Sequence, residues 1–394
     1  MQQESSTDPG VLPDSEKKSN MRIDGEKSAQ RRCSVLHLLV ETPETVMAYK
    51  EFVVAQAERQ KISVCTYFRS VSKMPAGVTL FEGNRTLLGF WRALKEALRS
   101  DDFDVIHAHF PNVAVPFLLV SFWKKRLMRK TVFTVHTSYQ NIKLRNRLLL
   151  MLVFLFFRKI ICCSRASYQS FPKVYRWLAG KRLGYIRNGV DTKRINQVRQ
   201  RSVQRDAESF TIITACRFVP IKNLQTALGA FRDINDGATR FTLIGDGPER
   251  MELETFCSQT GMNQHVEFTG LIPRDQVYER LLTSDVFIST SFGEGLPIAV
   301  MEAMGCGCPV ILSDIESHRE IAEGIDFIPL VEPKDAEELA KEIARFRDMT
   351  RSQRDLIGKQ CRQLIEEKFG LETMHAAYES IYLGKEVLEQ SSPE

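Results

Sequence analysis

The chain has 394 residues, of which 43% are apolar and 26% charged, an ordinary balance for a soluble globular protein that excludes a low-complexity chain. Its length is too great for one hydrophobic core and suits two domains of moderate size. The net charge is only +5, but no acidic residue lies between Asp104 and Asp191, where 16 lysines and arginines occur. Such a basic region attracts nucleic acid, an anionic substrate or an anionic membrane surface.

Three further features narrow the class of protein. The nine cysteines are odd in number, scattered and without a C-x-x-C pair, which argues against a disulfide framework or structural zinc site and fits the reducing cytosol. The longest unbroken apolar run, residues 148–157, has ten residues, whereas a bilayer-spanning helix needs about 20. Residues 1–31 are polar and charged and are predicted to form a disordered tail.

Short β-rich runs alternate with helical patterns along the rest of the chain. The predicted strands are 34–40, 62–68, 104–110, 131–137, 159–164 and 183–188, followed by 210–218, 240–247, 265–270, 285–291 and 308–314. Apolar strands separated by helices predict parallel sheets that are covered on both faces. The sequence therefore predicts two doubly wound α/β domains, 32–188 and 189–370, joined near residues 188–191.

In such domains a substrate lies at the carboxyl ends of the strands, in the cleft between the two sheets. Four predicted loops follow four of these strands. They contain His136, Arg217, the stretch "GDGPER" (245–250) and the stretch "FGEGLP" (292–297). We expect the four loops to converge on one site.

The stretch "SFGEGLPIAVMEAMG" (291–305) combines a turn with a helix start. Gly293 and Gly295 allow a sharp turn, and Pro297 suits the first position of a helix over about 297–306. The helix start would offer backbone N–H groups and a positive dipole end to an anion. Glu294 would then stand at the cleft mouth and Glu302 inside the helix. The alternative is that Glu294 is an ordinary turn residue and that Glu302 faces solvent from the helix. The apolar residues on both sides of Glu302 instead predict a buried carboxylate, which needs hydrogen-bond or charged partners.

Arg217 and Lys222 end one predicted strand and open a helix. Two cations at this point suit a diphosphate, although surface basic residues are an alternative for this pair alone. The "GDGPER" turn has Arg250 where a dinucleotide fingerprint has its third glycine, so it is weak evidence for NAD.

Three histidines follow or lie in neighbouring strands. His107 and His109 share one face of a strand. Together with His136 they could form a metal site, but no fourth ligand is evident, so no metal site is predicted. His136 is predicted to contact substrate.

At this point the motifs resemble those of a known family. "FGEGLPIAVMEAMGCGCPVI" resembles the E-x7-E signature of retaining glycosyltransferases of family 4, of the type that makes bacterial polysaccharides and glycolipids. "DVIHAHF", "TVFTVHT", "CCSRAS", "IRNGVD", "CRFVPIKNLQTAL", "LIGDGPER" and "VEFTGLIPRDQV" follow in the family's order. The resemblance covers residues 33–385. It implies the GT-B fold, two Rossmann-like domains facing a central cleft, with a last helix (371–388) that crosses back onto the first domain.

The resemblance also implies roles for individual residues. Arg217 and Lys222 would bind the donor diphosphate, Glu302 the ribose, and Glu294 the transferred sugar, with His136 near the reacting bond. The backbone amides at Gly295, Leu296, Pro297 and Ile298 would meet the diphosphate or sugar, and Gly270, Leu271 and Ile272 would lie near the base. The family needs no essential metal. The chain departs from the family after its first strand, where "LLVETPETVMAYKEF" has no Gly-Gly loop.

These observations predict a retaining, metal-independent hexosyltransferase that uses a UDP- or GDP-sugar and a lipid-linked or glycan acceptor. Residues 122–130 and 143–159 mix cations with apolar side chains, which predicts a cytoplasmic protein attached to the inner face of an anionic membrane. The alternative is that residues 148–157 form an ordinary buried helix. Rival functions are a nucleotide-sugar isomerase or non-catalytic binder of the same fold. A nucleic-acid-binding protein would not explain both glutamates beside Arg217 and Lys222.

Overall fold

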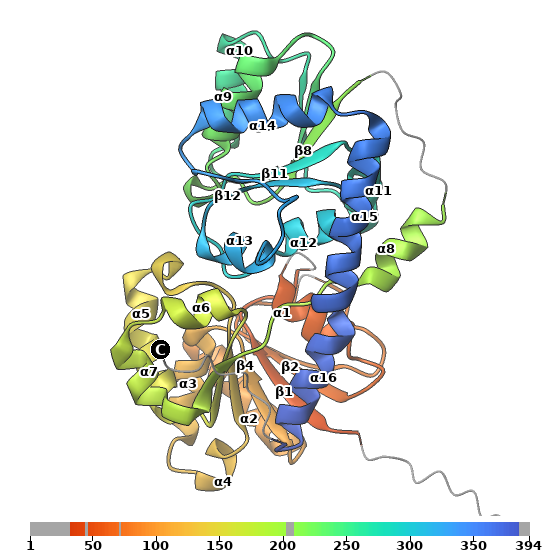
Figure 1. Cartoon of the computed structure of the whole chain (residues 1–394). Coiled ribbons are helices and arrows are strands. Elements are labelled where there is room, and N and C mark those ends of the chain that lie inside the picture. Colours follow the sequence, from red (N-terminus) through yellow and green to blue (C-terminus); the bar gives the residue numbers. More distant parts are fainter. Residues whose placement is uncertain (1–31, 44–45, 71, 202–208, 386–394) are drawn as a thin grey trace, which may run out of the picture. The chain divides into compact units, whose positions relative to one another are not determined.

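The computed structural model describes residues 32–43, 46–70, 72–201 and 209–385. The predicted tail 1–31 and the end of the predicted helix 371–388 lie outside these residues. Two sheets form within the described chain, and the strands of each sheet are parallel (Figure 1).

The first sheet has the strand order β3-β2-β1-β4-β5-β6-β7. Its strands are β1 (Ser34–Leu39), β2 (Lys61–Thr66), β3 (Thr79–Glu82), β4 (Val105–Ala108), β5 (Thr131–Val135), β6 (Lys159–Cys162) and β7 (Leu183–Tyr185). All six strands predicted in this half are present. The edge strand β3 was not predicted, because its four residues are too short and too exposed to stand out in the sequence.

The second sheet has the strand order β10-β9-β8-β11-β12-β13. Its strands are β8 (Thr211–Ala215), β9 (Arg240–Ile244), β10 (Val266–Gly270), β11 (Val286–Ser289), β12 (Val310–Ser313) and β13 (Leu330–Val331). The five strands predicted here are confirmed, and the two-residue β13 was not predicted. Numbered within the sheet, this order is 3-2-1-4-5-6, that of the Rossmann fold.

Helices connect the strands and cover the sheets (Figure 1). In the first half they are α1 (Met47–Tyr49), the π-helix η1 (Lys50–Val54), α2 (Leu87–Ser100), α3 (Pro111–Ser121), α4 (Lys125–Met128), η2 (Tyr139–Asn141), α5 (Leu144–Phe156), α6 (Arg165–Ser170), α7 (Lys173–Ala179) and η3 (Gly180–Arg182). After these come α8 (Thr192–Arg199), η4 (Pro220–Lys222), α9 (Leu224–Ile234), α10 (Arg250–Gln259), α11 (Arg274–Thr283), α12 (Ile298–Gly305), α13 (Glu316–Ile321), α14 (Ala336–Asp348), α15 (Arg351–Lys368) and α16 (Leu371–Tyr382).

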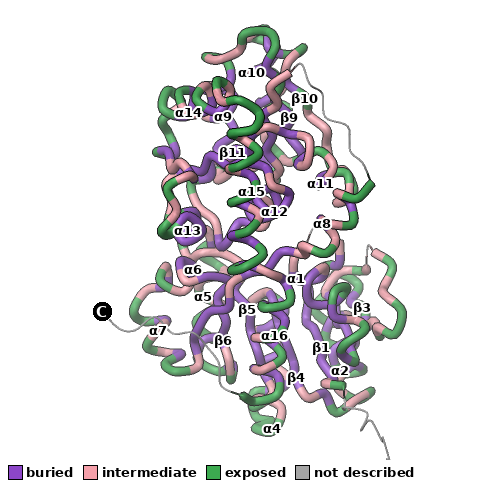
Figure 2. Tube along the Cα trace, turned by 45° about the vertical axis from the view of Figure 1, so that its right-hand side comes forward, coloured by how far each residue is buried: buried purple, intermediate pink, exposed green. Residues whose placement is uncertain are grey.

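Most of the strands are buried on both faces, as the apolar runs predict, and the edge strands β3 and β10 are the more exposed ones (Figure 2). The last helix, α16, packs on the first sheet, although it follows the second sheet in the chain. Its Tyr382 hydroxyl bonds His107 Nδ1 at 2.6 Å, and its Tyr378 hydroxyl bonds Thr134 Oγ1 at 2.9 Å. Tyr378 and Tyr382 also join Phe52 and strand residues of the first sheet in one buried apolar cluster.

Helix α5 contains residues 148–156 of the apolar run 148–157. Leu150, Val153 and Phe154 are buried in the first core, whereas Leu148 and Leu155 are 61% and 48% exposed. The alternative of a buried helix therefore holds for one face of α5, whereas the other face is apolar and exposed, and attachment to a membrane stays a prediction. Among the residues described, none of the helices combines the length and apolar character that a membrane span requires.

The strand order of the second sheet also determines where the loops after β8 and β11 lie. In the second sheet β8 and β11 are neighbours, while the chain leaves them toward opposite edges. Ligands of open α/β sheets bind outside the carboxyl ends of the strands at such a switch point. The loops after β8 and β11 contain Arg217, Lys222 and Glu294, so the fold places these three residues at the expected edge.

Candidate active site

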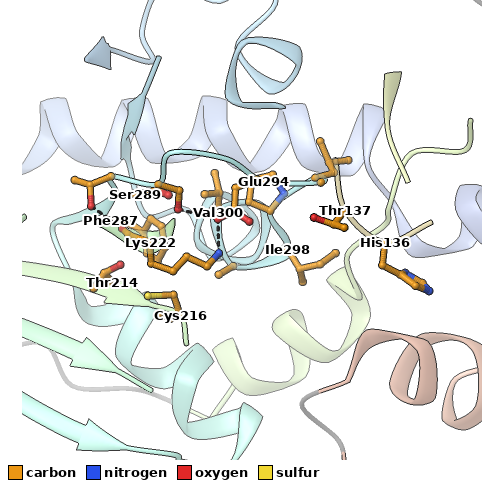
Figure 3. Close-up of a pocket in the computed structure, with 17 residues that line it drawn as sticks. His136, Thr137, Thr214, Cys216, Lys222, Phe287, Ser289, Glu294, Ile298 and Val300 are labelled. Atoms are coloured by element: carbon orange, nitrogen blue, oxygen red, sulfur yellow. Dashed lines mark hydrogen bonds and ion pairs between the residues drawn. The ribbon is translucent and has the colours of Figure 1, made fainter. Parts of the chain in front are cut away.

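A cavity of 150 Å³ lies at this switch point (Figure 3). The described residues that line it come from the ends of β5, β8 and β11 and from the start of α12: His136, Thr137, Thr214, Ala215, Cys216, Lys222, Phe287, Ser289, Thr290, Ser291, Glu294, Gly295, Leu296, Pro297, Ile298, Ala299 and Val300. Pockets for drug-sized ligands are roughly 300–1,000 Å³. The cavity therefore has room for one part of a nucleotide sugar, such as a sugar ring or a phosphate.

A charged pair is the main polar feature of the cavity. The Lys222 ammonium contacts Glu294 Oε1, and the Ser291 hydroxyl donates to the same oxygen at 2.8 Å. Both charged side chains keep partial access to solvent, with 20% of Lys222 and 13% of Glu294 exposed. A ligand that enters the cavity therefore meets a cation and a carboxylate side by side.

The turn that presents Lys222 is held by the residue that follows it. Asn223 has a φ of +51°, a left-handed conformation that asparagine tolerates better than most residues. Its side-chain amide donates to the carbonyls of Thr290 and Pro333 at 3.1 and 2.6 Å. Because Thr290 leads directly into the Glu294 loop, this amide ties the two loops of the site together.

The helix α12 begins at the cavity, as predicted, but one residue later than expected. Pro297 is the residue before the helix, with extended backbone angles, and Ile298 is the first helical residue. Ile298, Ala299 and Val300 all line the cavity. The positive end of the helix dipole and the first free N–H groups of α12 therefore face the space beside Lys222.

Glu302 lies one turn further into α12 and does not line the cavity. Its side chain is buried, and the carboxylate accepts from Arg274 Nη1 at 2.7 Å and from the Tyr278 hydroxyl at 2.9 Å. Lys50 Nζ, from the first half of the chain, lies 3.5 Å from Glu302 Oε1. The alternative of a solvated helix position was thus wrong, and the prediction of a buried carboxylate with partners is confirmed.

Four other predicted residues lie outside the cavity lining. Arg217 is exposed on the loop after β8, and Gly270 ends β10 with a φ of +69°. Leu271 is 71% exposed, and Ile272 packs at the edge of the second core. The structure brings together Lys222, Glu294 and residues 295–298, and it does not bring these four residues to the same cavity.

His136 meets the cavity with its backbone side rather than its ring. Figure 3 shows the His136 imidazole pointing away from Lys222 and Glu294. Its Nε2 atom lies 3.0 Å from His109 Nδ1. Burial lowers the pKa of His136 to about 4 and raises the pKa of the Cys216 thiol to about 12. Both groups are therefore neutral at pH 7, and Glu294 is the one residue with a carboxyl group among the described residues that line this cavity.

The structure adds residues that the sequence did not single out. Arg274 and Tyr278 are four positions apart on α11 and so share a helix face, a spacing that could have pointed to a common partner. Lys50 lies in the largely apolar stretch "VMAYKEFVV" (46–54), which gave no signal of a binding site. His37, rather than His136, groups with His107 and His109, with one nitrogen from each ring within 4.8 Å of the others.

The Glu294 loop also bonds the first half of the chain. The Ser138 and Ser164 hydroxyls donate to the carbonyls of Glu294 and Gly295 at 2.5 and 2.7 Å. Helix α13 adds a second contact, because Glu320 accepts from Ala166 N at 2.8 Å and from Arg187 Nε at 3.0 Å. These bonds join the Glu294 loop and α13 to the residues that follow β5, β6 and β7.

Gly295 is expected to tolerate no side chain. A Cβ atom there would lie 2.7 Å from the carbonyl oxygen of His136 and 2.9 Å from Thr137 Cα, and backbone atoms cannot yield cheaply. Gly295→Ala should therefore destabilise the protein by roughly 1–3 kcal/mol, the usual effect of overpacking. Gly293→Ala is the control, because its Cβ would meet the mobile amide of Asn141. Equal melting temperatures for the two variants would contradict this expectation.

Two sequence families match consecutive parts of the chain. Residues 51–194 match the family described as Glycosyltransferase Family 4, and residues 196–363 match Glycosyl transferases group 1. Each match contains most or all of one of the two sheets, so the boundary between the two matches falls close to the join that was predicted near residues 188–191.

Individual relatives and solved structures that are similar to this chain agree with these two family matches. WcaL of Escherichia coli K12, named for colanic acid biosynthesis, is 29% identical over 51% of both chains, so the chain spans about half the length of the curated relative that it matches. An Escherichia coli UDP-Gal:alpha-D-GlcNAc-diphosphoundecaprenol alpha-1,3-galactosyltransferase is 24% identical over 78% of this chain and 81% of its own. Anabaena HepE, solved with UDP-glucose, is 19% identical and superposes with a TM-score of 0.71 over 89% of this chain and 99% of its own. The fold is the GT-B arrangement of two Rossmann-like sheets.

Proposed function

We propose that this chain, a GT-B protein similar to glycosyltransferases of family 4, is a retaining glycosyltransferase of polysaccharide or glycolipid biosynthesis. It would move a sugar from a nucleotide-sugar donor to a lipid-linked or glycan acceptor. The observation that carries this proposal is the Lys222–Glu294 pair beside the start of α12, at the switch point of the second sheet. A cation and a helix start suit a phosphate, and a carboxylate suits sugar hydroxyls, so the cavity offers both halves of a donor site.

The remaining donor contacts are assigned by extension from this cavity. Arg217 would reach the diphosphate from the exposed loop after β8, and Glu302 would hold the ribose. Gly270, Leu271 and Ile272 would lie near the base. HepE was solved with UDP-glucose, and the galactosyltransferase relative is named for UDP-Gal. These names favour a UDP-sugar over a GDP-sugar as the first donor to test.

The chemistry proposed for this site is a front-face transfer. The bond from the sugar C1 to the phosphate oxygen breaks, the acceptor oxygen bonds C1 on the same face, and its proton passes to the departing phosphate oxygen. Lys222 and the α12 dipole stabilise the charge that develops on the diphosphate, so no metal ion is needed in this scheme. Glu294 is held by Lys222 and Ser291, which suits orienting the sugar rather than attacking C1.

A panel of UDP- and GDP-sugars tests the proposal. Thermal shift and donor hydrolysis in the presence of EDTA should identify one donor that both stabilises the protein and is hydrolysed slowly. Nuclear magnetic resonance of the transfer product should then show retention at the anomeric carbon. Binding without hydrolysis or transfer would favour a non-catalytic binder, and a rearranged nucleotide sugar would favour an isomerase. An inverted product would overturn the front-face path.

The acceptor side of the proposal rests on a surface of the first half of the chain, which we call the apolar-basic surface. It consists of exposed apolar residues on or beside α3, α5 and α7: Leu119, Phe122, Trp123, Leu144, Leu148, Met151, Leu152, Leu155, Phe156, Val174 and Trp177. Helix α5 packs against both α3 and α7, so the three helices that present these residues are neighbours. All of them lie in the segment without acidic residues. We propose that this surface holds the protein at the inner, anionic face of a cell membrane, where lipid-linked acceptors lie.

Flotation with vesicles tests the membrane attachment. The protein should float with phosphatidylglycerol vesicles at low salt and much less with phosphatidylcholine vesicles or at high salt, because each nearby cation contributes about 1 kcal/mol at an anionic surface. Trp177, 79% exposed on α7, should contribute to binding through its indole. Trp177→Ala should reduce flotation, while Trp91→Ala, on α2 outside the apolar-basic surface, should not. Equal flotation of the two variants would contradict the assignment of the surface.

A further inference from the structure

A chain of buried hydrogen bonds leads from helix α13 to the Glu294 carboxylate. His318 lies on α13, and its Nδ1 atom is 2.8 Å from the carbonyl oxygen of Ser313, the last residue of β12. The Ser313 hydroxyl donates to the carbonyl of Ser291 at 2.7 Å, and the Ser291 hydroxyl donates to Glu294 Oε1 at 2.8 Å. His318, Ser313 and Ser291 are all buried. The chain therefore connects a residue outside the cavity to the carboxylate that lines it.

Carbonyl oxygens fix the direction of the protons in this chain. A carbonyl oxygen only accepts hydrogen bonds, so its contact with His318 requires a proton on Nδ1 of the ring. The single proton of the Ser313 hydroxyl is committed to the Ser291 carbonyl in the same way. Ser313 Oγ lies 3.1 Å from His318 Nδ1 and therefore meets the ring with a lone pair. The Nδ1–H group of His318 is thus shared between both oxygens of Ser313.

The second nitrogen of the His318 ring faces the neighbouring strand. Burial lowers the pKa of His318 to about 4, so the ring is neutral at pH 7 and Nε2 carries a lone pair. Ser289 Oγ lies 3.5 Å from Nε2, a long contact in which the hydroxyl is the donor. Ser289 ends β11 and lines the cavity (Figure 3). One ring therefore spans the ends of β11 and β12 directly behind the Glu294 loop.

The Glu294 loop is held on two sides. The Asn223 amide holds the side of the Lys222 turn, and the Ser313 hydroxyl holds the Ser291 carbonyl on the side of β12. The contacts of the Glu294 carboxylate with Ser291 and Lys222 both fall on Oε1. Oε2 has no hydrogen-bond partner within the described part of the chain. The carboxylate is thus fixed through one oxygen and offers the other to a ligand.

We infer that His318 is a positioning residue, which acts through Ser313 and Ser291 so that Glu294 presents Oε2 to a hydroxyl of the bound sugar. His318 itself touches no substrate, because its ring is fully buried. The sugar contact rests on the proposed function, whereas the hold on Glu294 in the empty protein does not. A histidine that only packs α13 against the sheet would affect stability and leave the carboxylate where it is.

Nuclear magnetic resonance of the empty protein tests the hold on Glu294. In ¹⁵N-labelled protein we expect the His318 ring to be protonated on Nδ1 and unprotonated on Nε2. In ¹³C-labelled protein the Glu294 carboxyl signal, assigned with Glu294→Gln, should shift in Ser313→Ala and in His318→Leu. Ser317→Ala is the control, because this buried hydroxyl of α13 has no partner among the described residues. A proton on Nε2, or a Glu294 signal that ignores both variants, would overturn the inference.

Kinetics with the donor found in the panel test the consequence for transfer. His318→Leu removes the N–H group at similar size, and kcat should fall about tenfold, the value of one hydrogen bond, with little change in the KM of the donor. His318→Asn keeps an amide N–H near the position of Nδ1 and should retain most of the activity. Ser313→Ala, the smaller change, should lower kcat as His318→Leu does.

A double-variant cycle separates positioning from packing. If His318 acts through Glu294, then His318→Leu should have almost no further effect on kcat in a Glu294→Gln background. Equal losses with and without the Glu294 carboxylate would contradict the positioning role, because packing acts in both backgrounds.

The outcomes also separate this inference from the proposed function. If the Glu294 signal responds as expected and no nucleotide sugar is bound or turned over, the hold on Glu294 stands and the proposed function fails. If transfer is observed and the Glu294 signal responds to neither variant, the function stands and the inference fails.

Discussion

Lys222→Ala should reduce sugar transfer by about two orders of magnitude or more, while the protein remains folded. The Lys222 ammonium is the cation that lines the cavity, and it is placed there by η4 and the Asn223 amide. Removing one preorganised group that stabilises developing charge typically costs ~3 kcal/mol of transition-state stabilisation. The measurement is kcat with the donor found in the panel, and Lys222→Arg, which keeps the positive charge, should retain more activity than Lys222→Ala.

The ion pair with Glu294 requires a second control. Lys222→Ala leaves the Glu294 carboxylate without its cation, and that alone could disturb the site. The double variant Lys222→Ala/Glu294→Ala removes both charges. If Lys222 acts on the leaving diphosphate, the double variant should be at least as slow as Lys222→Ala. Recovery of activity in the double variant, or a loss of only a few-fold in the single variant, would show that Lys222 only neutralises Glu294.

The folded protein should begin to lose stability as the pH falls below about 6.5, which is higher than the pH at which carboxyl groups titrate. Burial lowers the pKa values of six imidazoles: slightly for His375, and strongly for the five that belong to His37, His107, His109, His136 and His318. The unfolded chain binds a proton at each of these five side chains as the pH falls through about 6.5, whereas the folded protein does not. Stability is therefore present above pH 6.5 and is lost as the pH falls below it, toward the folded values near 3 and 4.

The size of this effect follows from proton linkage. Each imidazole that stays neutral costs roughly 1 kcal/mol at pH 5.5, so the five together cost about 5 kcal/mol, a large part of a typical folding free energy. Glu51 and Glu249 act in the opposite direction, because burial raises their pKa values, but they are only two groups. The carboxyls with lowered pKa values, such as Glu372 at about 2, act only at lower pH.

Thermal melts at pH 7.5, 6.5 and 5.5 and constant ionic strength measure the acid effect. The melting temperature should fall only slightly between pH 7.5 and 6.5 and steeply from 6.5 to 5.5. His37→Asn removes one of the five imidazoles and should make the fall less steep. A melting temperature that stays constant down to pH 5.5 would contradict the burial of neutral imidazoles.

Local sequence was enough to predict most of the fold. Eleven runs of apolar, β-rich residues became eleven strands, because a strand that is buried on both faces must be apolar along its length. The two strands that were not predicted from the sequence are β3 and β13, which are too short to show a periodic pattern. The loop residues Lys222 and Glu294 were predicted as neighbours for a topological reason, since parallel strands bring their carboxyl ends to one edge.

Residue type and spacing determine where each strand lies along the chain and how deeply it is buried, because both depend on local periodicity. They also determine the sheet edge at which each loop emerges, because parallel strands all end at the same edge. Side-chain contacts between distant segments do not follow from them. The approach of Lys50 to Glu302, the ring of His136 turned away from Lys222, and the chain of hydrogen bonds from His318 through Ser313 to Ser291 each join residues from separate strands or helices. Periodicity within one segment contains no information on which ring nitrogen meets which partner. Only the packing of whole elements around the cavity decides that.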